Sequence, residues 1–354
     1  MRVVVVGATG NVGSSLVRLL AEDARIDSIV GVARRRPSID PPKTTWVEAD
    51  IVDADLVAHF RGAGAVVHLA WLIQPSRDLE QLERVNVEGS ARVFEAVADA
   101  GVPALVYASS VAAYSPGPKD RLVDESWPIG GIPSSFYARH KANVERRLDV
   151  LEREQPRVRV VRLRPALIFK REAASGIRRL FAGPFVPSPL LDPRFIPLVP
   201  DVPGLRFQAA HTGDVAEAYR LALVTDVRGA FNLAAEPVLD PPLLADLFGA
   251  RLVPMPAAVA RAAVSLSWRL HVQPSPPGWF DLGRTVPLLD CSRARDELGW
   301  RPRRRADEAL LELIEGMRER AGDDTPPLSP TTGGPARTRE LATGVGRRGG
   351  TGTD

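Results

Sequence analysis

The first thirteen residues constrain the fold more than any other part of the chain. Residues 3–6 are four consecutive valines, which predict a strand buried on both faces, and a glycine-rich turn separates them from a helical pattern. Glycine permits a tight turn and close approach of the backbone to a phosphate, and a helix N-terminus offers unpaired N–H groups to an anion. This order of strand, turn and helix predicts a dinucleotide-binding unit. The turn consists of Gly7, Ala8, Thr9, Gly10, Asn11, Val12 and Gly13.

Short apolar runs alternate with longer helical patterns through the first half of the chain. This alternation predicts an α/β fold in which a Rossmann-type doubly wound parallel sheet is covered by helices on both faces. Crossovers between parallel strands are right-handed, which leaves few other topologies. The expected strands are residues 3–6, 28–32, 65–69, 104–107 and 158–163, and the expected helices are residues 13–21, 79–100 and 136–154.

The regular alternation stops after residue 164, which predicts a smaller, partly irregular C-terminal substrate lobe. Residues 183–204 are rich in proline and apolar side chains and predict irregular structure over a cleft. From residue 322 onward large apolar residues are almost absent, so we expect disorder. The expected boundaries are 1–164 and 207–235 for the Rossmann domain, 165–206 and 236–321 for the lobe, and 322–354 for the tail.

Composition and charge exclude several classes of protein. Hydrophobic residues make up 45% and charged residues 25%, which is typical of a globular protein. The net charge of +3 is small and scattered, so we expect no nucleic-acid partner. The apolar stretch 257–270 is too short to span a membrane, so no membrane association is expected. Cys291 is the single cysteine and the N-terminus lacks a signal-peptide layout, which favours a cytoplasmic protein.

Two strand ends bear on the choice of cofactor. The second expected strand is followed by Arg34 and Arg35, with no acid at the junction to hold ribose hydroxyls. A guanidinium suits the 2′-phosphate, so the junction favours NADP over NAD, and a solvated basic loop is the alternative. At the end of the next strand, Asp50 could accept a hydrogen bond from an adenine amino group while Ile51 packs on the ring. Asp50 could equally be a turn or N-cap residue.

Tyr137 and Lys141 are the central candidates for chemistry. They lie four residues apart on an expected helix and therefore share one face. An ordinary tyrosine pKa of about 10 is too high for acid–base work near neutrality, and we expect an adjacent ammonium and a nicotinium charge to lower the pKa of Tyr137. A surface helix is the alternative interpretation. Ser109 and Ser110 follow a central strand, beside the expected ligand crevice, where they could orient a substrate or only satisfy loop backbone groups.

Together these motifs resemble the extended short-chain dehydrogenase/reductases of the NAD-dependent epimerase/dehydratase family. The resemblance covers about residues 1–320, and the order of the motifs makes it specific. Besides the glycine turn and the Tyr137–Lys141 pair, the supporting segments are His68-Leu69-Ala70, Asn86-Val87-Glu88-Gly89, Ser109-Ser110, Arg164-Pro165, His211-Thr212-Gly213-Asp214-Val215-Ala216 and Leu298-Gly299-Trp300-Arg301-Pro302.

The resemblance implies a role for each of several residues. It selects Ser110 as the catalytic hydroxyl, because Ser110 stands four residues before Tyr114. It implies that Tyr137 is the acid/base, that Lys141 binds the cofactor ribose and that Asn86 holds the helix geometry beside the site. It also implies that Leu69 and Ala70 line the adenosine-ribose path, and it suggests a homodimer. The five histidines show no metal-ligand spacing, so no metal is expected.

The chain departs from the family pattern at three places. Val111 and Ala112 stand where dehydratases carry an Asp-Glu pair, which disfavours dehydration. The Asn that contacts diphosphate in sugar-nucleotide enzymes is absent after the sixth strand. The lobe is unusually apolar, as in residues 185–191, which favours a less charged small-molecule substrate. Phosphates could still meet Arg171, Arg178, Arg179 and Arg206.

Three functions remain open from the sequence. The first is an NAD(P)-dependent oxidoreductase that acts on a carbonyl or alcohol of a small, fairly apolar substrate. The second is an NAD-dependent sugar-nucleotide epimerase that uses the same residues. The third is a non-catalytic protein that senses NADP(H), although such relatives commonly lack the Tyr/Lys pair that this chain retains.

Overall fold

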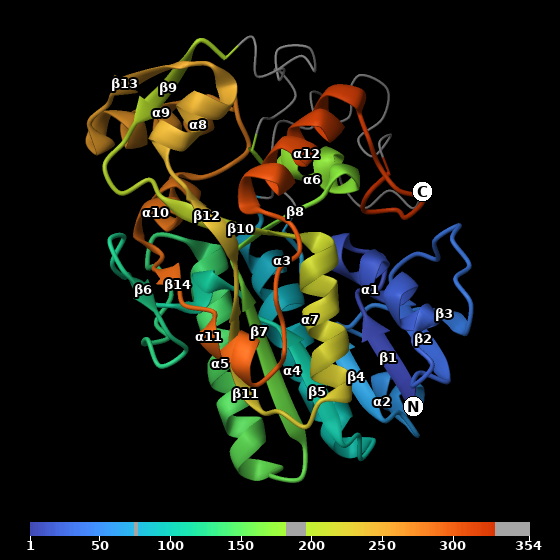
Figure 1. Cartoon of the computed structure of the whole chain (residues 1–354). Helices are drawn as coiled ribbons and strands as arrows, with labels where there is room; N and C mark the ends of the chain where they lie inside the picture. Colours follow the sequence, from blue (N-terminus) through green and yellow to red (C-terminus); the bar gives the residue numbers. More distant parts are fainter. Residues whose placement is uncertain (74–76, 182–195, 330–354) are drawn as a thin grey trace.

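A seven-stranded parallel sheet forms the centre of the molecule (Figure 1). In this computed structural model the described residues are 1–73, 77–181 and 196–329. The strand order β11-β7-β5-β4-β1-β2-β3 confirms the predicted Rossmann-type doubly wound fold, and every pairing in this sheet is parallel. The strands are β1 (Arg2–Val6), β2 (Ser28–Ala33), β3 (Thr44–Glu48), β4 (Ala65–His68), β5 (Ala104–Ala108), β7 (Arg159–Pro165) and β11 (Gly229–Leu233).

The valines of β1 are buried on both faces of the sheet, which explains their unbroken apolar run. Val3 and Val5 pack with α1 (Asn11–Glu22) and α7 (Thr212–Val224), whereas Val4 and Val6 belong to the opposite core. That second core includes side chains from α2 (Leu56–Phe60), α4 (Gly89–Asp99) and α5 (Phe136–Glu154). Since successive side chains of a strand point to opposite faces, helices on both sides require apolar residues at every position.

The helix expected over residues 79–100 is divided in three. A short α3 (Leu79–Glu83) leads into a π-helical turn (Arg84–Glu88), and α4 continues from it. Such single-turn π segments are frequent at functional sites. This one carries Asn86, which is fully buried.

The lobe is built on short sheets above the carboxyl ends of the central strands (Figure 1). Residues 207–211, which we placed with the Rossmann domain, instead form the middle strand of a separate three-stranded sheet. The small sheets are β12 (Ala235–Leu239), β10 (Phe207–His211) and β8 (Leu167–Phe169); β13 (Arg251–Pro254) with β9 (Leu198–Asp201); and β14 (Leu288–Leu289) with β6 (Leu122–Val123). The partners of β10 are β8 and β12, the segments that directly follow β7 and β11 in the chain.

Helices complete the lobe and the end of the described chain. The remaining helices are α6 (Ala174–Phe181), α8 (Pro241–Phe248), α9 (Ala257–Arg269), α10 (Pro277–Thr285), α11 (Ser292–Asp296) and α12 (Ala306–Glu319), with 3₁₀ turns at Val111–Ala113 and Arg171–Ala173. Within the three described ranges, no helix has the length and apolar character needed to cross a membrane. The apolar residues 185–191 lie outside the described residues, as does most of the proline-rich segment.

The disorder expected from residue 322 was placed too early. Residues 322–329 pack against the domain, with Thr325 and Leu328 buried. Asp323 forms a bidentate ion pair with Arg18 of α1, at 2.7 and 2.8 Å. These contacts join distant parts of the chain, so composition alone gave no sign of them. Residues 330–354 lie outside the described part.

His68 at the end of β4 provides a test of how the core responds to pH. Its ring is fully buried, Nε2 lies 2.9 Å from the Ser90 hydroxyl, and burial lowers the pKa of His68 to about 3. The unfolded chain binds a proton on this side chain near pH 6.5 and the folded chain does not, so stability falls as the pH drops below 6.5. We expect His68 to contribute a loss of about 2 kcal/mol in the free energy of unfolding between pH 7 and pH 5.

Urea unfolding of the wild type and of His68→Gln at both pH values measures this contribution. The variant should lose less stability than the wild type on acidification. An equal loss in both proteins would show that His68 is not the responsible group.

Candidate active site

The glycine turn after β1 forms a cradle at the carboxyl edge of the sheet. Gly7 has φ +85°, and a Cβ placed on it would lie 2.5 Å from the Ala70 backbone nitrogen. A Cβ on Gly13 would lie 2.3 Å from the Gly7 carbonyl oxygen. No group in the described ranges accepts a hydrogen bond from the backbone N–H groups of Asn11, Val12 and Gly13. Free N–H groups at the N-terminus of a 12-residue helix fit a pyrophosphate.

The corner beside β2 contains a carboxylate as well as the expected arginines. Arg34 and Arg35 are exposed directly after Ala33, the last residue of β2. Ala33 pairs in register with Glu48 of β3, and the Glu48 carboxylate accepts a 2.8 Å hydrogen bond from the Arg36 backbone N–H. We expected no acid at this junction from the residues that follow β2. The neighbouring strand supplies one.

Asp50 and Ile51 both make contacts within the protein that limit their access to a cofactor. Asp50 Oδ1 accepts a 3.1 Å hydrogen bond from the Val52 backbone N–H, in agreement with the alternative of a turn residue. Ile51 is only 5% exposed, and its side chain lies against Gly89 at the start of α4. Little of the Ile51 surface is therefore open to an adenine ring.

The structure brings Ser110, Tyr137 and Lys141 together. Helix α5 begins after Ser135, whose hydroxyl caps it by accepting from the Ala138 N–H. This start places Tyr137 in the first turn and Lys141 in the second, with the Lys141 Nζ 5.9 Å from the centre of the phenol ring. The Ser110 side chain lies beside the Tyr137 phenol, and the Ser110 hydroxyl accepts a 3.2 Å hydrogen bond from the Ala112 backbone N–H.

Two tryptophans enclose the tyrosine and the lysine. Trp279 of α10 is stacked on Tyr137, with ring centres 5.0 Å apart and planes at 30°. The Trp71 ring packs against the same phenol in a T-shaped arrangement, with ring centres 6.0 Å apart. The Lys141 Nζ lies 3.5 Å from the centre of the Trp71 ring and donates a 2.6 Å hydrogen bond to the Ala108 carbonyl. Lys141 is consequently only 3% exposed.

This enclosure changes the expected ionisation of the pair. Burial raises the pKa of Tyr137, and the nearby Ser110 hydroxyl opposes that rise only in part. Burial also holds the pKa of Lys141 well below its ordinary value, while the negative charge of Glu145 acts in the opposite direction. The expected lowering of the Tyr137 pKa is therefore wrong for the protein without a ligand. The reason is that apolar rings disfavour both charged forms.

Asn86 acts on a loop rather than on its own helix. Its side-chain oxygen accepts from the Leu72 N–H at 2.7 Å, and its amide donates to the Leu72 carbonyl at 3.0 Å. The resemblance implied that Asn86 holds the helix geometry. In the structure it clamps the residue next to Trp71, because the π-helical turn directs its side chain toward the end of β4.

The chain matches a known protein family over half its length. The sequence model of the NAD dependent epimerase/dehydratase family matches residues 3–180. The chain belongs to this family.

Relatives and solved structures of this family differ in how much they share with the chain. An uncharacterized Mycobacterium tuberculosis protein, Rv2047c, is 28% identical over 326 residues, which are 91% of this chain and 31% of that protein. The chain thus spans about a third of the length of such relatives. The UDP-glucose 4-epimerase of Mycolicibacterium smegmatis is 27% identical over 353 residues, covering 91% of this chain and 100% of the relative.

Two solved structures have the same fold as this chain. MoeE5 in complex with UDP-glucuronic acid and NAD is 24% identical, with a TM-score of 0.64 over 90% of this chain and 99% of that one. The UDP-glucose 4-epimerase of Thermus thermophilus, in complex with NAD, is 23% identical, with a TM-score of 0.65 and the same coverage. At this identity the likeness establishes the fold.

A cluster of buried charges behind the site was missed by the sequence reasoning. Arg162 and Arg164 project from β7 and are 6% and 4% exposed, and Glu145 of α5 is 1% exposed. Their signal in the sequence was two arginines at alternate positions of a central strand, which must lie on one face and need a buried carboxylate. Trp71 and Trp279 were also missed, since nothing local to them predicts contact with Tyr137.

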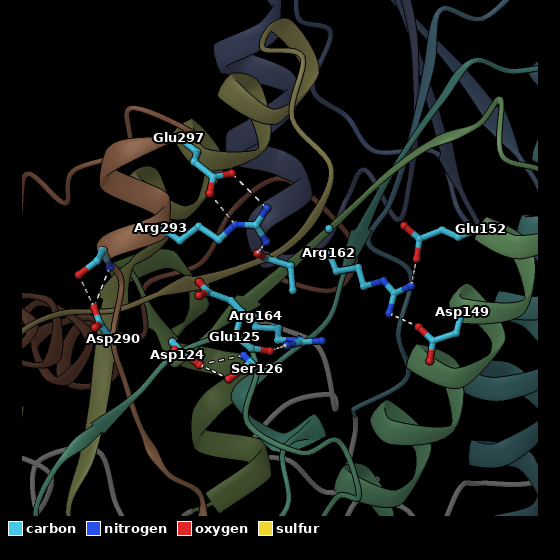
Figure 2. Close-up of a pocket in the computed structure, with 13 residues that line it drawn as sticks. Asp124, Glu125, Ser126, Asp149, Glu152, Arg162, Arg164, Asp290, Arg293 and Glu297 are labelled. Atoms are coloured by element: carbon cyan, nitrogen blue, oxygen red, sulfur yellow. Dashed lines mark hydrogen bonds and ion pairs between the residues drawn. The ribbon is translucent and has the colours of Figure 1, made fainter.

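A polar cavity of about 710 Å³ opens on the outer side of these arginines (Figure 2). Asp149 and Glu152 of α5 line it, together with Glu125 and with Asp290 and Glu297, which flank α11. Figure 2 shows Arg162 paired with Asp149 and Glu152 at its wall. Ser110, Tyr137 and Lys141 are not among its lining residues, so this cavity is separate from the candidate active site.

In the described part of the chain, no group of His, Cys, Asp and Glu side chains is arranged to hold a metal ion.

Two further motifs of the family meet in the fold. Trp300 is fully buried, and its indole N–H donates a 2.7 Å hydrogen bond to the Asp214 carbonyl. The Asp214 carboxylate accepts from the Arg304 backbone N–H at 3.1 Å. These bonds fasten the segments around Trp300 and Arg304 to α7.

Proposed function

We propose that this chain is an NAD(P)-dependent oxidoreductase that transfers a hydride between nicotinamide and a carbonyl or alcohol of a small, fairly apolar substrate. The observation that carries the proposal is the convergence of the Ser110 hydroxyl, the Tyr137 phenol and the Lys141 ammonium at the sheet edge that also bears the open helix N-terminus. Ligands of doubly wound folds bind at this edge. A nicotinamide dinucleotide, when bound, supplies or accepts the hydride.

Each residue has a distinct part in the proposed reaction. Tyr137 gives its proton to the substrate oxygen during reduction and takes one during oxidation. Ser110 polarises the same oxygen through its hydroxyl, which lies beside the phenol. Lys141 stabilises the phenolate form of Tyr137 and donates to the ribose. Because the Trp71 indole covers the ammonium, we expect it to shift when a ligand contacts Lys141.

The surroundings of Tyr137 favour an apolar substrate. Trp71 and Trp279 contact the phenol, and Leu72 and Phe136 belong to the same apolar cluster. Charged groups lose hydration in such a site without gaining a partner. Val111 is partly buried beside the neighbouring cluster and supplies no acid or base, which argues against a dehydratase.

The cofactor would bind across the glycine turn. Gly7, Gly10 and Gly13 would face the pyrophosphate, and Leu69 and Ala70 would line the path of the ribose. Exposed Arg34 and Arg35 support NADP, whereas the Glu48 carboxylate at the same corner supports NAD. Both structural neighbours above contain NAD. We propose NADP as the preferred cofactor, since two exposed guanidinium groups outweigh a carboxylate held by a backbone N–H.

A sugar-nucleotide epimerase is the second candidate. It is favoured by the full-length match to the M. smegmatis UDP-glucose 4-epimerase. Arg206 in the lobe, whose side chain is 40% exposed, could meet a phosphate. An NADP(H) sensor is the third candidate, and the enclosed but intact Tyr137–Lys141 pair speaks against it.

Turnover assays distinguish the three candidates. We expect the purified protein to consume NADPH with acetophenone or phenanthrenequinone, and to bind NADPH more tightly than NADH when both are titrated in parallel. Replacing Arg34 and Arg35 together by Ala should remove that preference. Conversion of UDP-glucose to UDP-galactose with no net consumption of cofactor would instead establish the epimerase. Binding that discriminates oxidised from reduced cofactor, with no turnover of any probe, would establish the sensor.

A further inference from the structure

Glu145 connects the two halves of the candidate active site. It follows Lys141 by four residues on α5, which places both side chains on the same buried face of the helix. One carboxylate oxygen accepts a 2.5 Å hydrogen bond from the Ser109 hydroxyl, next to Ser110. The Glu145 carboxylate therefore contacts the Ser109–Ser110 turn directly, and Glu145 lies one helical turn from Lys141.

The other contacts of Glu145 hold its charge in place. Arg164 donates to both carboxylate oxygens, at 2.8 and 3.0 Å, and Arg162 donates to one of them at 3.0 Å. Arg164 in turn donates to the Tyr114 hydroxyl at 2.9 Å and to the Glu125 carbonyl at 3.1 Å. With four donated hydrogen bonds, the carboxylate is ionised, and its position is fixed from the strand side.

Stability alone is a weak explanation for this cluster. Removing two guanidinium groups and a carboxylate from water is expensive, and well-packed apolar side chains of similar volume are often as stable or more stable. The cluster of Glu145, Arg162 and Arg164 also lies at a particular point of the central sheet. There the turn of Ser109 and Ser110 contacts α5, the helix that carries Tyr137 and Lys141. A role in the site accounts for that location.

Lys141 faces no other carboxylate in the described contacts. On its own helix it faces Tyr137 and Glu145, and from β5 it faces the Tyr107 ring at 5.2 Å. From the end of β4 it faces the Trp71 ring and His68, and burial keeps that histidine uncharged by lowering its pKa to about 3. Glu145 is thus the negative charge that offsets the burial of the ammonium.

We propose that Glu145 is a positioning residue, whose carboxylate anchors the Ser109–Ser110 turn and keeps the Lys141 ammonium protonated behind Trp71. This inference rests on the proposed function, because it acts through Ser110 and Lys141. It assigns Arg162 and Arg164 the task of holding that carboxylate in place.

The charge of Lys141 can be followed without substrate or cofactor. The sequence contains four lysines, Lys43, Lys119, Lys141 and Lys170, so protein labelled with ¹³C at lysine Cε gives few NMR signals. Lys141→Arg identifies the signal of interest. In Glu145→Gln we expect the titration midpoint of Lys141 to move down by about one pH unit or more, as for loss of a nearby opposite charge. An unchanged midpoint would overturn the proposal.

Three further variants separate charge from structure. Glu145→Asp keeps the charge, so Lys141 should titrate as in the wild type; a shift as large as in Glu145→Gln would contradict the proposal. Asp149→Asn removes another carboxylate paired with Arg162, at the outer cavity, and should leave Lys141 unchanged. If Glu145→Gln fails to fold, Glu145→Met combined with Arg164→Met removes both charges together and should still lower the midpoint, by less than the loss of the carboxylate alone because the Arg164 positive charge is lost as well; an unchanged or raised midpoint would overturn the proposal.

Kinetics test the serine half of the proposal. Ser109→Ala and Glu145→Asp should each slow single-turnover hydride transfer from NADPH to phenanthrenequinone by about tenfold, with little change in the KM for NADPH. Wild-type rates in both variants would overturn the proposal that Glu145 anchors the Ser109–Ser110 turn. If the wild type itself transfers no hydride to any probe, the proposed function fails, while the NMR titration still decides whether Glu145 controls Lys141.

Discussion

Replacing Tyr137 by Phe is expected to lower the turnover number by about 10²- to 10⁴-fold, the range for loss of a general acid–base group. The substitution removes one hydroxyl and leaves the ring, so stacking on Trp279 and packing against Trp71 should persist. The dissociation constant for NADPH should stay nearly unchanged, because the glycine turn and the N-terminus of α1 carry the proposed phosphate contacts. Steady-state kinetics and a fluorescence titration with NADPH measure both quantities.

Tyr219→Phe is the matched control for this substitution. Tyr219 lies in α7 on the other side of the sheet and is 1% exposed, and within the described contacts its hydroxyl makes no hydrogen bond with Ser110, Tyr137 or Lys141. We expect wild-type turnover from it. Normal turnover by Tyr137→Phe would contradict the assignment of the acid/base and leave only the fold and the cofactor cradle.

Replacing Gly13 by Ala is expected to destabilise the protein and to abolish dinucleotide binding. The added methyl would lie 2.3 Å from the Gly7 carbonyl oxygen and 2.8 Å from the Ala8 carbonyl carbon, and both are backbone atoms that cannot rotate away. Overpacking of this kind typically costs about 1–3 kcal/mol. Relief of the clash requires α1 to move away from the turn, which separates the free N–H groups of Asn11 and Val12 from the phosphate position.

Urea unfolding and NADPH titration check this prediction against two other glycines. Gly176→Ala in α6 adds a methyl with nothing within 4 Å and should stabilise the protein by about 0.5–1 kcal/mol. Gly10→Ala meets only the Gly7 carbonyl oxygen at 3.4 Å, so it should fold normally. Unaltered stability and NADPH affinity in Gly13→Ala would show that the turn tolerates a side chain and is not a phosphate cradle.

The fold was predictable where the signal is local. The valine run of β1, the glycine turn and the alternation of strands and helices follow from side-chain periodicity, which acts over a few residues. The same holds for the spacing that puts Tyr137 and Lys141 on one face of α5. Residues 207–235 were expected to belong to the Rossmann domain, whereas residues 207–211 pair with β8 and β12 in a separate sheet, because strand pairing depends on contacts between segments far apart in the chain.

The choice between Ser109 and Ser110 shows the limit of local reasoning. Both serines follow the same strand, and only the family resemblance separated them. In the structure the Ser110 side chain lies beside Tyr137, whereas the Ser109 hydroxyl donates a hydrogen bond to Glu145. The two hydroxyls therefore have different partners, and those partners lie 27 and 36 residues farther along the chain.

By itself the sequence determined the Rossmann architecture, the family and the candidate groups for catalysis. Only the tertiary structure decided the electrostatic state of those groups. Trp71, Trp279 and the Glu145 cluster reach the site from segments far apart in the chain, and together they bury Lys141 and cover much of Tyr137. The pKa of a side chain depends on the solvation and charge around it in space, so spacing along the chain can predict which groups meet but not how they ionise.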